Sequence, residues 1–403
     1  MIVGIVGGGQ LARMLALAGH PLGLEFVFLD PAIDACAAPL GEHLCGRYDD
    51  RVLLARLAAR ADLSTYEFEN VPEESVEFLS GLGTVHPNAR ALAAARDRLH
   101  EKALFREMGI PIPPFAAVDT RADLERAAVR IGLPAVLKTR TLGYDGKGQA
   151  VLRSAGDLDA AWVRLGDARL ILEGLVPFDR EVSLIAVRGV NGETLFYPLA
   201  ENTHQDGVLR LSVSRPGDPM QVLAENYARR LLDTLGYVGV LALELFQTGG
   251  TLLASEMAPR VHNSGHWTIE GAQTSQFENH LRAIVGLPLG ATAPMGYAAM
   301  VNLIGTMPDA GSMLAAPGVH LHAYGKLARP GRKLGHATVR AENTQDLRIR
   351  LDRLLALIGP KAAARPSGGA RFRDDRLGDP PETEKMLEIH RANPSIYSTD
   401  YSV

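Results

Sequence analysis

The sequence lacks the features that would direct its function toward a membrane or a nucleic acid. No window approaches the ~20 apolar residues of a membrane span, and Gly7-Gly8-Gly9 interrupts the apolar N-terminus before it could resemble a secretory signal. The net charge of -4 gives no reason to expect nucleic-acid binding. The two cysteines, Cys36 and Cys45, fit neither a metal nor a redox spacing. We therefore expect a cytoplasmic protein with reduced thiols that acts on small molecules.

What the sequence does contain is enough apolar residues for more than one core. With 403 residues and 46% apolar content, it predicts two or three domains of ordinary globular composition. Alternating strand and helix patterns indicate an α/β protein, α+β overall, with domains at 1–110, 111–187 and 188–361. From 362 to 403, Gly, Pro, Arg and Asp dominate and apolar periodicity stops, so we expect a loose tail.

Residues 1–30 have the pattern strand, glycine turn, helix, strand. Gly7, Gly9 and Ala12 fall where a dinucleotide-binding fingerprint places small residues, and Asp30 ends the second strand. This pattern permits an NAD(P)-dependent oxidoreductase in which Asp30 binds the ribose. A phosphate at the helix N-terminus, or a purely structural turn, is equally compatible with it. The first thirty residues leave these three interpretations open.

Polar side chains also follow the next predicted strand, which begins at Asp62. Glu67, Glu69 and Asn70 fall at its carboxyl end, the edge at which open parallel sheets bind ligands. Residues 92–108 then predict a single helix, and the Pro-rich linker after it marks the first domain boundary.

A glycine-rich hairpin follows the predicted strand that ends in Lys138. Counting both ends, the segment from Lys138 to Gln149 has three glycines and two lysines, a composition suited to covering a polyphosphate with N–H groups and cations. The spacing is not that of a P-loop, and a mobile surface hairpin is the alternative. Two acids follow at strand ends. Glu173, with the backbone to Val176, is suited to an adenine edge and Glu181 to ribose hydroxyls, although either side chain could instead face water.

The clearest candidate for a metal site is a predicted hairpin that turns at Gly249-Gly250. Glu244 lies in its first apolar strand and Glu256 in the return strand. Acids are depleted in apolar strands, and two at neighbouring positions repel unless a cation lies between them. The alternative is that each faces solvent or a lysine. A polar run, Arg260–His266, follows the return strand.

Two further segments carry polar residues. A predicted strand at Phe196–Leu199 precedes a polar run at 201–207. The segment Tyr324–His336 is basic and contains glycine, which favours a phosphate-bearing ligand or, alternatively, a solvated turn.

In this order, the features resemble the ATP-grasp family of carboxylate–amine ligases. Longer motifs resemble the 5-(carboxyamino)imidazole ribonucleotide synthases among them, namely Gly7–Met14, Thr65–Pro72, Gly143–Gln149, His204–Gly207, Glu256–His266 and Arg329–His336. The resemblance implies an ATP-grasp fold with an N-terminal Rossmann-like parallel-sheet domain, a small α+β lid domain and a larger mixed-sheet C-terminal domain.

The resemblance also implies roles for individual residues. ATP is expected to contact Arg98, Lys138, Gly143, Tyr144, Asp145, Gly146, Lys147, Gly148, Gln149, Glu173, Gly174, Leu175, Val176, Glu181, His204, Ser255 and Glu256. Mg²⁺, with Mn²⁺ as the alternative ion, is expected at Glu244 and Glu256. The ribotide and bicarbonate are expected at Gln10, Glu67, Tyr144, Arg260, His262, Lys326, Arg332 and Lys333. The catalytic set implied is Asp145, Lys147, Arg260 and His262.

The implied reaction is the carboxylation of 5-aminoimidazole ribonucleotide by bicarbonate and ATP, through carboxyphosphate, in purine biosynthesis. The resemblance also implies a homodimer. A ligase of the same fold acting on another amine is the nearest alternative, and the NAD(P)-dependent oxidoreductase is the alternative of a different class. Two positions depart from the family pattern. They are Ser255, where Asn is frequent, and Lys147, where Arg is frequent.

Overall fold

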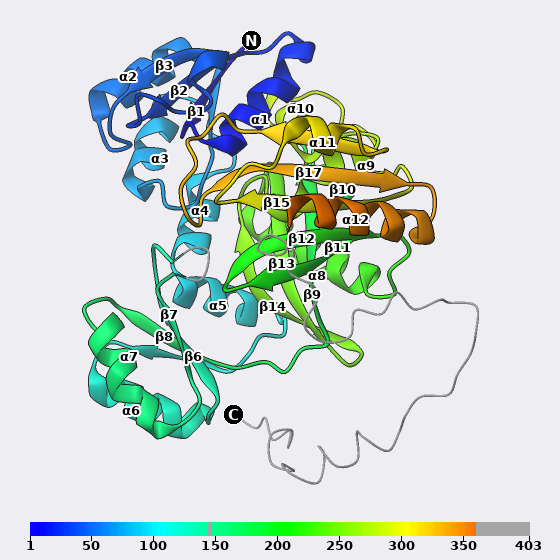
Figure 1. Ribbon diagram of the computed structural model, residues 1–403. Helices are drawn as coiled ribbons and strands as arrows, with labels where there is room; N and C mark the ends of the chain where they lie inside the picture. The colour runs from blue at the N-terminus through cyan, green and yellow to red at the C-terminus, as the bar shows by residue number, and fades with distance from the viewer. Residues whose placement is uncertain (144–146, 360–403) are drawn as a thin grey trace. The chain divides into compact units, whose positions relative to one another are not determined.

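The computed structural model describes residues 1–143 and 147–359, which form three β-sheets (Figure 1). The described residues belong to one unit, Met1–Arg365. The predicted tail at 362–403 and the predicted site residues Tyr144, Asp145 and Gly146 lie outside the described residues. No helix within the described ranges is long and apolar enough to cross a membrane.

The first sheet is parallel, as predicted for an N-terminal Rossmann-like domain. Its strand order is β3-β2-β1-β4. The strands are β1 (Ile2–Val6), β2 (Glu25–Asp30), β3 (Glu42–Cys45) and β4 (Leu63–Tyr66), and the helices between and after them are α1 (Gln10–Gly19), α2 (Arg51–Arg60) and α3 (Glu73–Ser80). Because the strands run the same way, the acids that follow β2 and β4 meet at one edge of the sheet.

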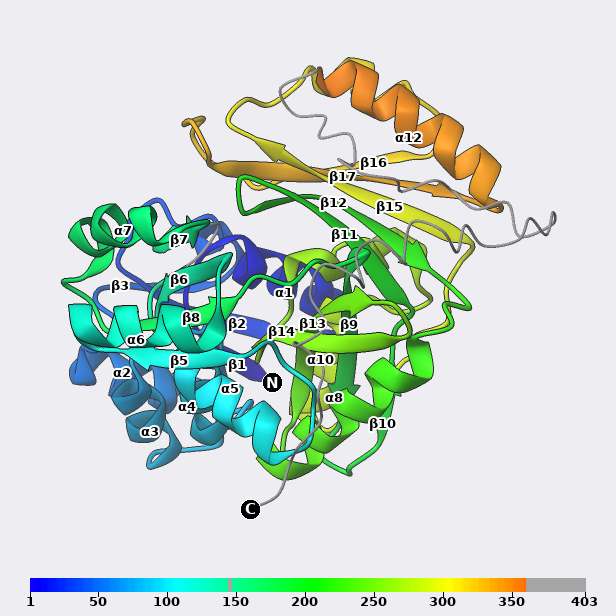
Figure 2. The ribbon, with the colours of Figure 1, turned by 90° about the horizontal axis from the view of Figure 1, so that it is seen from below.

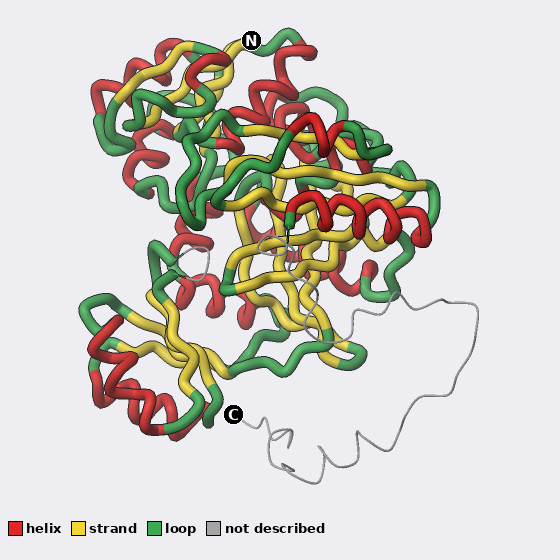
Figure 3. The backbone as a smooth tube through the Cα atoms, viewed as in Figure 1, coloured by secondary structure: helices red, strands yellow, loops and turns green. Residues whose placement is uncertain are grey.

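The second sheet is antiparallel and carries the predicted lysine strand. Its order is β5-β8-β6-β7, with strands β5 (Phe115–Val118), β6 (Ala135–Thr139), β7 (Gln149–Leu152) and β8 (Leu170–Gly174). Two helices, α6 (Arg121–Ile131) and α7 (Leu158–Leu165), share one apolar core with it. Figure 3 shows both helices beside these strands at the lower left. Thr120 caps α6 by accepting from Asp123 N, and the Thr120–Asp123 spacing of this capping box is visible in the sequence.

The third sheet is the largest and is antiparallel throughout its described pairs. Its path is β14-β13-β9-β11-β12-β15-β17-β16, and β10 pairs with β9. The strands are β9 (Arg180–Arg188), β10 (Thr194–Phe196), β11 (Leu199–Gln205), β12 (Val208–Arg215), β13 (Gly239–Thr248), β14 (Thr251–Ala258), β15 (Tyr297–Ile304), β16 (Val319–Ala323) and β17 (Lys333–Ala341). The helices are α8 (Gln221–Leu235), α9 (Thr268–Gly271), α10 (Gln276–Val285), α11 (Ala310–Leu314) and α12 (Thr344–Ile358). Figure 2 shows α12 lying along β15–β17.

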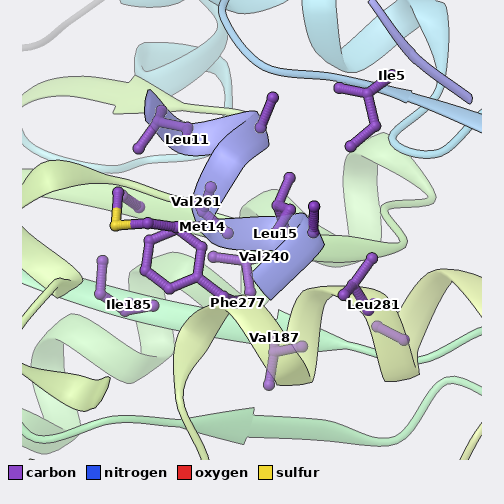
Figure 4. Packing of buried hydrophobic residues seen from close by; sticks show 14 of the residues in the cluster. Ile5, Leu11, Met14, Leu15, Ile185, Val187, Val240, Val261, Phe277 and Leu281 are labelled. Atoms are coloured by element: carbon purple, nitrogen blue, oxygen red, sulfur yellow. The ribbon is translucent and has the colours of Figure 1, made fainter. Parts of the chain in front are cut away.

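Side chains of β13, in the third sheet, alternate between two apolar cores. On β13, Leu241, Leu243 and Leu245 enter the core that contains α8, whereas Val240 and Ala242 enter the core that contains α1 and α10. Figure 4 shows the second of these cores, where α1 packs against residues of the third sheet and α10, with Leu11, Met14, Leu15, Ile185, Val187, Val240, Phe277 and Leu281 among those labelled. This packing fixes the N-terminal end of α1, and Gln10 with it, against the third sheet.

Two predicted elements are wrong. The single helix predicted at 92–108 is two helices, α4 (Ala89–Arg96) and α5 (Arg98–Glu107). Asp97 interrupts them because its backbone is extended, with φ -115° and ψ 114°, while its side chain caps Leu99 N and pairs with Arg140 at 2.5 Å.

The second error concerns the predicted strand at Phe196–Leu199. β10 ends at Phe196, β11 begins at Leu199, and the polar run to Gln205 belongs to β11. Its polar residues are stable in a strand because they have ionic partners, such as Arg215 for Glu201 at 3.0 Å.

Candidate active site

A cleft of about 830 Å³ brings together residues from all three sheets. Most of the predicted site residues line it, namely Gln10, Glu67, Arg98, Lys138, Gly143, Lys147, Gln149, Leu175, Glu181, His204, Glu244, Ser255, Glu256, Arg260, His262 and Lys333. Of the other described residues in the predicted set, Gly148, Glu173, Gly174, Val176, Lys326 and Arg332 are not part of the cleft lining.

The two hairpin carboxylates, which the sequence predicted at neighbouring strand positions, lie directly opposite each other. Glu244 of β13 pairs with Glu256 of β14, and the next pair is Leu245 with Ala254. The register shift leaves Ser255 without an opposite residue in β13, so Ser255 is the extra residue of a β-bulge. Both glutamates therefore face the cleft, away from the core that contains Leu243 and Leu245.

The two carboxylates differ in charge. Loss of surrounding water and the nearby charge of Glu256 raise the pKa of Glu244 to about 7. Loss of water opposes ionisation of Glu256 as well, but the Arg98 guanidinium at 2.8 Å lowers the pKa of Glu256 to about 2. Negative charge is thus concentrated between the strands and is only partly compensated. This arrangement favours a bound cation.

His262 and Arg260 lie just beyond the hairpin with defined partners. Burial and the Arg260 charge lower the pKa of His262 to about 3, so its ring is neutral near pH 7. Ser264 N donates to Nδ1 at 3.3 Å, which leaves Nε2 as the protonated nitrogen that contacts Glu244 at 3.1 Å. Arg260 Nε donates to Glu69 at 2.5 Å, so the edge of the first sheet holds this guanidinium.

Lys138 of the cleft belongs to a buried ion-pair cluster with Glu173 and Lys102. Lys138 Nζ donates to Glu173 Oε2 at 2.9 Å, and Lys102 Nζ lies 3.7 Å from the same oxygen. The other oxygen of Glu173 is buried and has no hydrogen-bond partner among the described residues. Glu173 therefore orients Lys138 and leaves one acceptor unused.

A second acid with a defined partner lies on β9. Glu181 bonds to His204 of β11 through the Nδ1 atom of the ring. Burial opposes protonation, but the hydrogen bond to Glu181 raises the pKa of His204. Glu181 and His204 thus form one polar unit on the cleft wall.

The predicted phosphate-binding segment is only partly in the cleft. Lys333 lines it, and Lys326 donates to Gln10, a lining residue. Arg332 instead donates to the carbonyl of Leu327 at 3.2 Å.

The dinucleotide interpretation of the first turn is wrong. Gly8 N donates to Asp30 at 2.8 Å, and Gly9 N and Leu11 N donate to Glu67 at 2.5 and 3.1 Å. The N–H groups that would bind a pyrophosphate therefore already bind the protein's own carboxylates. Glycine is required at position 9 because a Cβ there would overlap Glu67 Oε1.

Sequence reasoning missed the pairing of Glu69 with Arg260 and the buried residues Glu101 and Lys102. Arg98, Glu101 and Lys102 have the spacing i, i+3 and i+4, which puts them on one face of α5. That spacing was a usable signal, but a charged helical face is ordinarily predicted to face solvent, and this one faces β14.

Three family descriptions match the chain. They are the ribonucleotide synthetase preATP-grasp domain at 1–96, the ATP-grasp domain at 103–277 and the phosphoribosylaminoimidazole carboxylase C-terminal domain at 298–350. The chain is 58% identical, over 89% of its length and 99% of the relative's, to N5-carboxyaminoimidazole ribonucleotide synthase of Pseudomonas aeruginosa.

Solved structures agree with these matches. The N5-carboxyaminoimidazole ribonucleotide synthetase of Thermus thermophilus has 56% identity and a TM-score of 0.85, covering 89% of this chain and 99% of that one. The N5-carboxyaminoimidazole synthase of Aspergillus clavatus, in complex with ADP and 5-aminoimidazole ribonucleotide, has 30% identity and a TM-score of 0.83, covering 89% and 98%. The chain therefore belongs to the N5-carboxyaminoimidazole ribonucleotide synthase family of ATP-grasp enzymes.

Proposed function

We propose that the protein carboxylates the exocyclic amine of 5-aminoimidazole ribonucleotide, using bicarbonate and ATP, and forms N5-carboxyaminoimidazole ribonucleotide, ADP and phosphate. The observation that carries this proposal is the pair Glu244 and Glu256, which face each other in a cleft that Lys138 and Arg260 also line. Relatives described with ADP and with 5-aminoimidazole ribonucleotide support the choice of substrates.

The nucleotide is proposed to lie between the second and third sheets. Its phosphates would meet Arg98, Lys138 and the glycine-rich hairpin, and its ribose would meet Glu181 and His204. Glu173, which the resemblance implies at the adenine edge, is not part of the cleft lining, and its proposed role is to orient Lys138 toward the nucleotide. We also propose that the nucleotide contacts Leu175, Val176 and Ser255.

The facing carboxylates fit Mg²⁺, for which Mn²⁺ is the alternative ion. Carboxylate oxygens are the ligands that Mg²⁺ prefers, and the raised pKa of Glu244 marks a place where positive charge is missing. No cluster of three His, Cys, Asp or Glu suited to a metal occurs in 1–143 and 147–359. Substrate phosphates and water would complete the ligand set, as is usual for this ion. When bound, the ion neutralises charge on the phosphates.

The acceptor side of the cleft is proposed to begin at Arg260. Its guanidinium, which pairs with Glu69, would stabilise the oxygens of carboxyphosphate. His262 is neutral and presents Nε2–H, so it orients by hydrogen bonding and does not act as an imidazolium acid. Gln10, Glu67, Lys326, Arg332 and Lys333 remain the proposed ribotide contacts.

The proton of the amine is proposed to pass to Asp145, which the sequence predicted as a catalytic acid–base and which lies outside the described residues. Carboxyphosphate hydrolyses readily, so exclusion of water by the hairpin at 143–149 would protect it. We further propose that the protein is cytoplasmic and acts as a homodimer. Sedimentation analysis of the purified protein tests the oligomeric state.

Product analysis tests the function. Purified protein is incubated with ATP, Mg²⁺, ¹³C-bicarbonate and 5-aminoimidazole ribonucleotide, and phosphate release and product mass are measured. We expect phosphate release that depends on the ribotide, together with a product heavier by one labelled carboxyl group. A parallel reaction with glycinamide ribonucleotide tests the related ligase activity. Absence of phosphate release with the imidazole acceptor would contradict the proposal.

A further inference from the structure

Helix α5 holds the edge of the carboxylate hairpin through buried polar side chains. β14 is the edge strand of its sheet, so its outer backbone groups are not paired by another strand. Lys102 Nζ donates to the carbonyls of Ala254, at 3.5 Å, and Ser255, while Met257 N donates to Glu101 at 2.6 Å. Lys102 is 0% exposed and Glu101 is 1% exposed. Both buried side chains therefore contact the backbone of this short stretch of strand.

The carbonyl that Lys102 holds belongs to the residue that decides where Glu256 points. Leu252 and Ala254 enter the core with α8, and simple alternation would send residue 256 to the same core. Ser255 is the bulged residue, and Met257 enters that core instead. Because of this one extra residue, Glu256 lies on the cleft face, opposite Glu244.

Lys102 also contacts the nucleotide side of the site. Its Nζ lies 3.7 Å from Glu173 Oε2, the oxygen that accepts from Lys138 at 2.9 Å. A fully buried ammonium is unfavourable unless its donors are matched, and a methionine would fill similar space without that requirement. The charge therefore indicates a role in orientation that apolar packing would not supply.

We propose that Lys102 is a positioning residue, which holds the Ser255 bulge and the Glu173–Lys138 pair together so that Glu256 and Lys138 act on one bound nucleotide. Lys102 is not part of the cleft lining, so it acts through these neighbours. The inference rests on the nucleotide and magnesium roles proposed above.

Two substitutions on the same helix separate this role from general stability. Lys102→Met removes the charge and the donors and keeps most of the volume. Arg106→Met, one turn farther along, also removes a cation, and its guanidinium lies over the Phe115 ring at 5.4 Å. ADP binding is measured by calorimetry at increasing Mg²⁺, together with thermal melting and the KM for each substrate.

We expect Lys102→Met to bind ADP about tenfold more weakly at saturating Mg²⁺ and to require more Mg²⁺ for half-maximal binding, about 1.4 kcal/mol in binding free energy. Its KM for the ribotide should stay within about twofold of wild type, as should ADP binding by Arg106→Met. Lys102→Arg, which keeps the charge and N–H donors, should recover most of the lost affinity. If Lys102→Met shows no cooperative melting, Lys102→Gln replaces it under the same criteria.

Wild-type ADP binding by Lys102→Met, or an equal loss in Lys102→Arg, would overturn the inference. A wild-type protein that binds no ADP with Mg²⁺ would instead contradict the proposed function. The two failures are therefore distinguishable.

Discussion

Two regions of the molecule place a pair of carboxylates beside a glycine-containing turn, and the pairs have opposite environments. At the first turn, Asp30 and Glu67 accept from the backbone N–H groups of Gly8, Gly9 and Leu11. At the hairpin, Glu244 and Glu256 face each other. The acids of the first pair accept from N–H groups of the protein itself, whereas the second pair concentrates negative charge without such donors. The available partners, more than the residue types, decide which pair is left to bind a cation.

The largest expected effect comes from removing a charge at the hairpin. Glu256→Gln should lower ATP turnover about 1000-fold with any acceptor, because a carboxylate beside the nucleotide phosphates is lost. Phosphate release under saturating substrates measures the effect. Glu25→Gln, at an exposed carboxylate in β2, is the matched control. Turnover above a tenth of the wild-type rate would show that the two regions do not differ in the proposed way.

Arg260→Ala tests whether Arg260 acts on the acceptor side of the cleft, while Glu256 acts on the nucleotide side. Carboxylation should fall about 100-fold, since a fixed donor to the activated carbonate is removed. ADP affinity should stay close to wild type, because Arg260 pairs with Glu69 on the acceptor side. Calorimetry and product analysis on the same preparation separate the two quantities. Equal loss of ADP binding in Arg260→Ala and Glu256→Gln would contradict this division.

At the first turn, we expect a substitution to change the free energy of unfolding. Asp30 accepts from Gly8 N and the Tyr48 hydroxyl at 2.8 Å each, so Asp30→Asn should lower the free energy of unfolding by about 2 kcal/mol. Urea denaturation measures this change. Neither wild type nor variant should show saturable NAD(P) binding. Unchanged stability, or NAD(P) binding by the wild type, would remove the contrast between the regions.

A carboxylate that pairs with lysines gives a third case, with an expected effect of similar size that appears only at acidic pH. Burial opposes ionisation of Glu173, but Lys102 and Lys138 lower its pKa to about 2. Because the folded pKa lies below the unfolded value, its stabilisation is present above pH ~4.5 and is lost as pH falls toward ~2. Between pH 5 and 3, the unfolding free energy of wild type should fall about 2 kcal/mol more than that of Glu173→Gln. Parallel pH profiles would contradict the ion-pair account.

Much of the fold could be predicted because its signals are local. The βαβ opening, the Thr120 cap and the hairpin at Gly249-Gly250 depend on residues a few positions apart. The break at Asp97 could not be predicted, since its reason is an ion pair with Arg140, which follows β6 of the second sheet. The polar strand β11 was missed because its partners, including Arg215, lie on a neighbouring strand.

The candidate site was also only partly predictable from the sequence, because some of its contacts join residues that are far apart in the chain. Most of the described residues that the family motifs predicted for the site line the cleft, and the family itself is confirmed. Alternation along β14 alone would have put Glu256 in the core, and only the Ser255 bulge corrects it. The bulge is held by Lys102, 153 positions away from Ser255 in sequence. The spacing of Arg98, Glu101 and Lys102 puts them on one face of α5, but it does not reveal which strand that face contacts.

Titration of ADP binding with Mg²⁺ tests the central claim most directly, because it asks whether the facing carboxylates bind the cation. In wild type, calorimetry should give an ADP affinity that rises with Mg²⁺. In Glu244→Gln and Glu256→Gln this rise should be lost, while the Mg²⁺-independent affinity stays near the wild-type value. The same Mg²⁺ dependence in all three proteins would contradict the account.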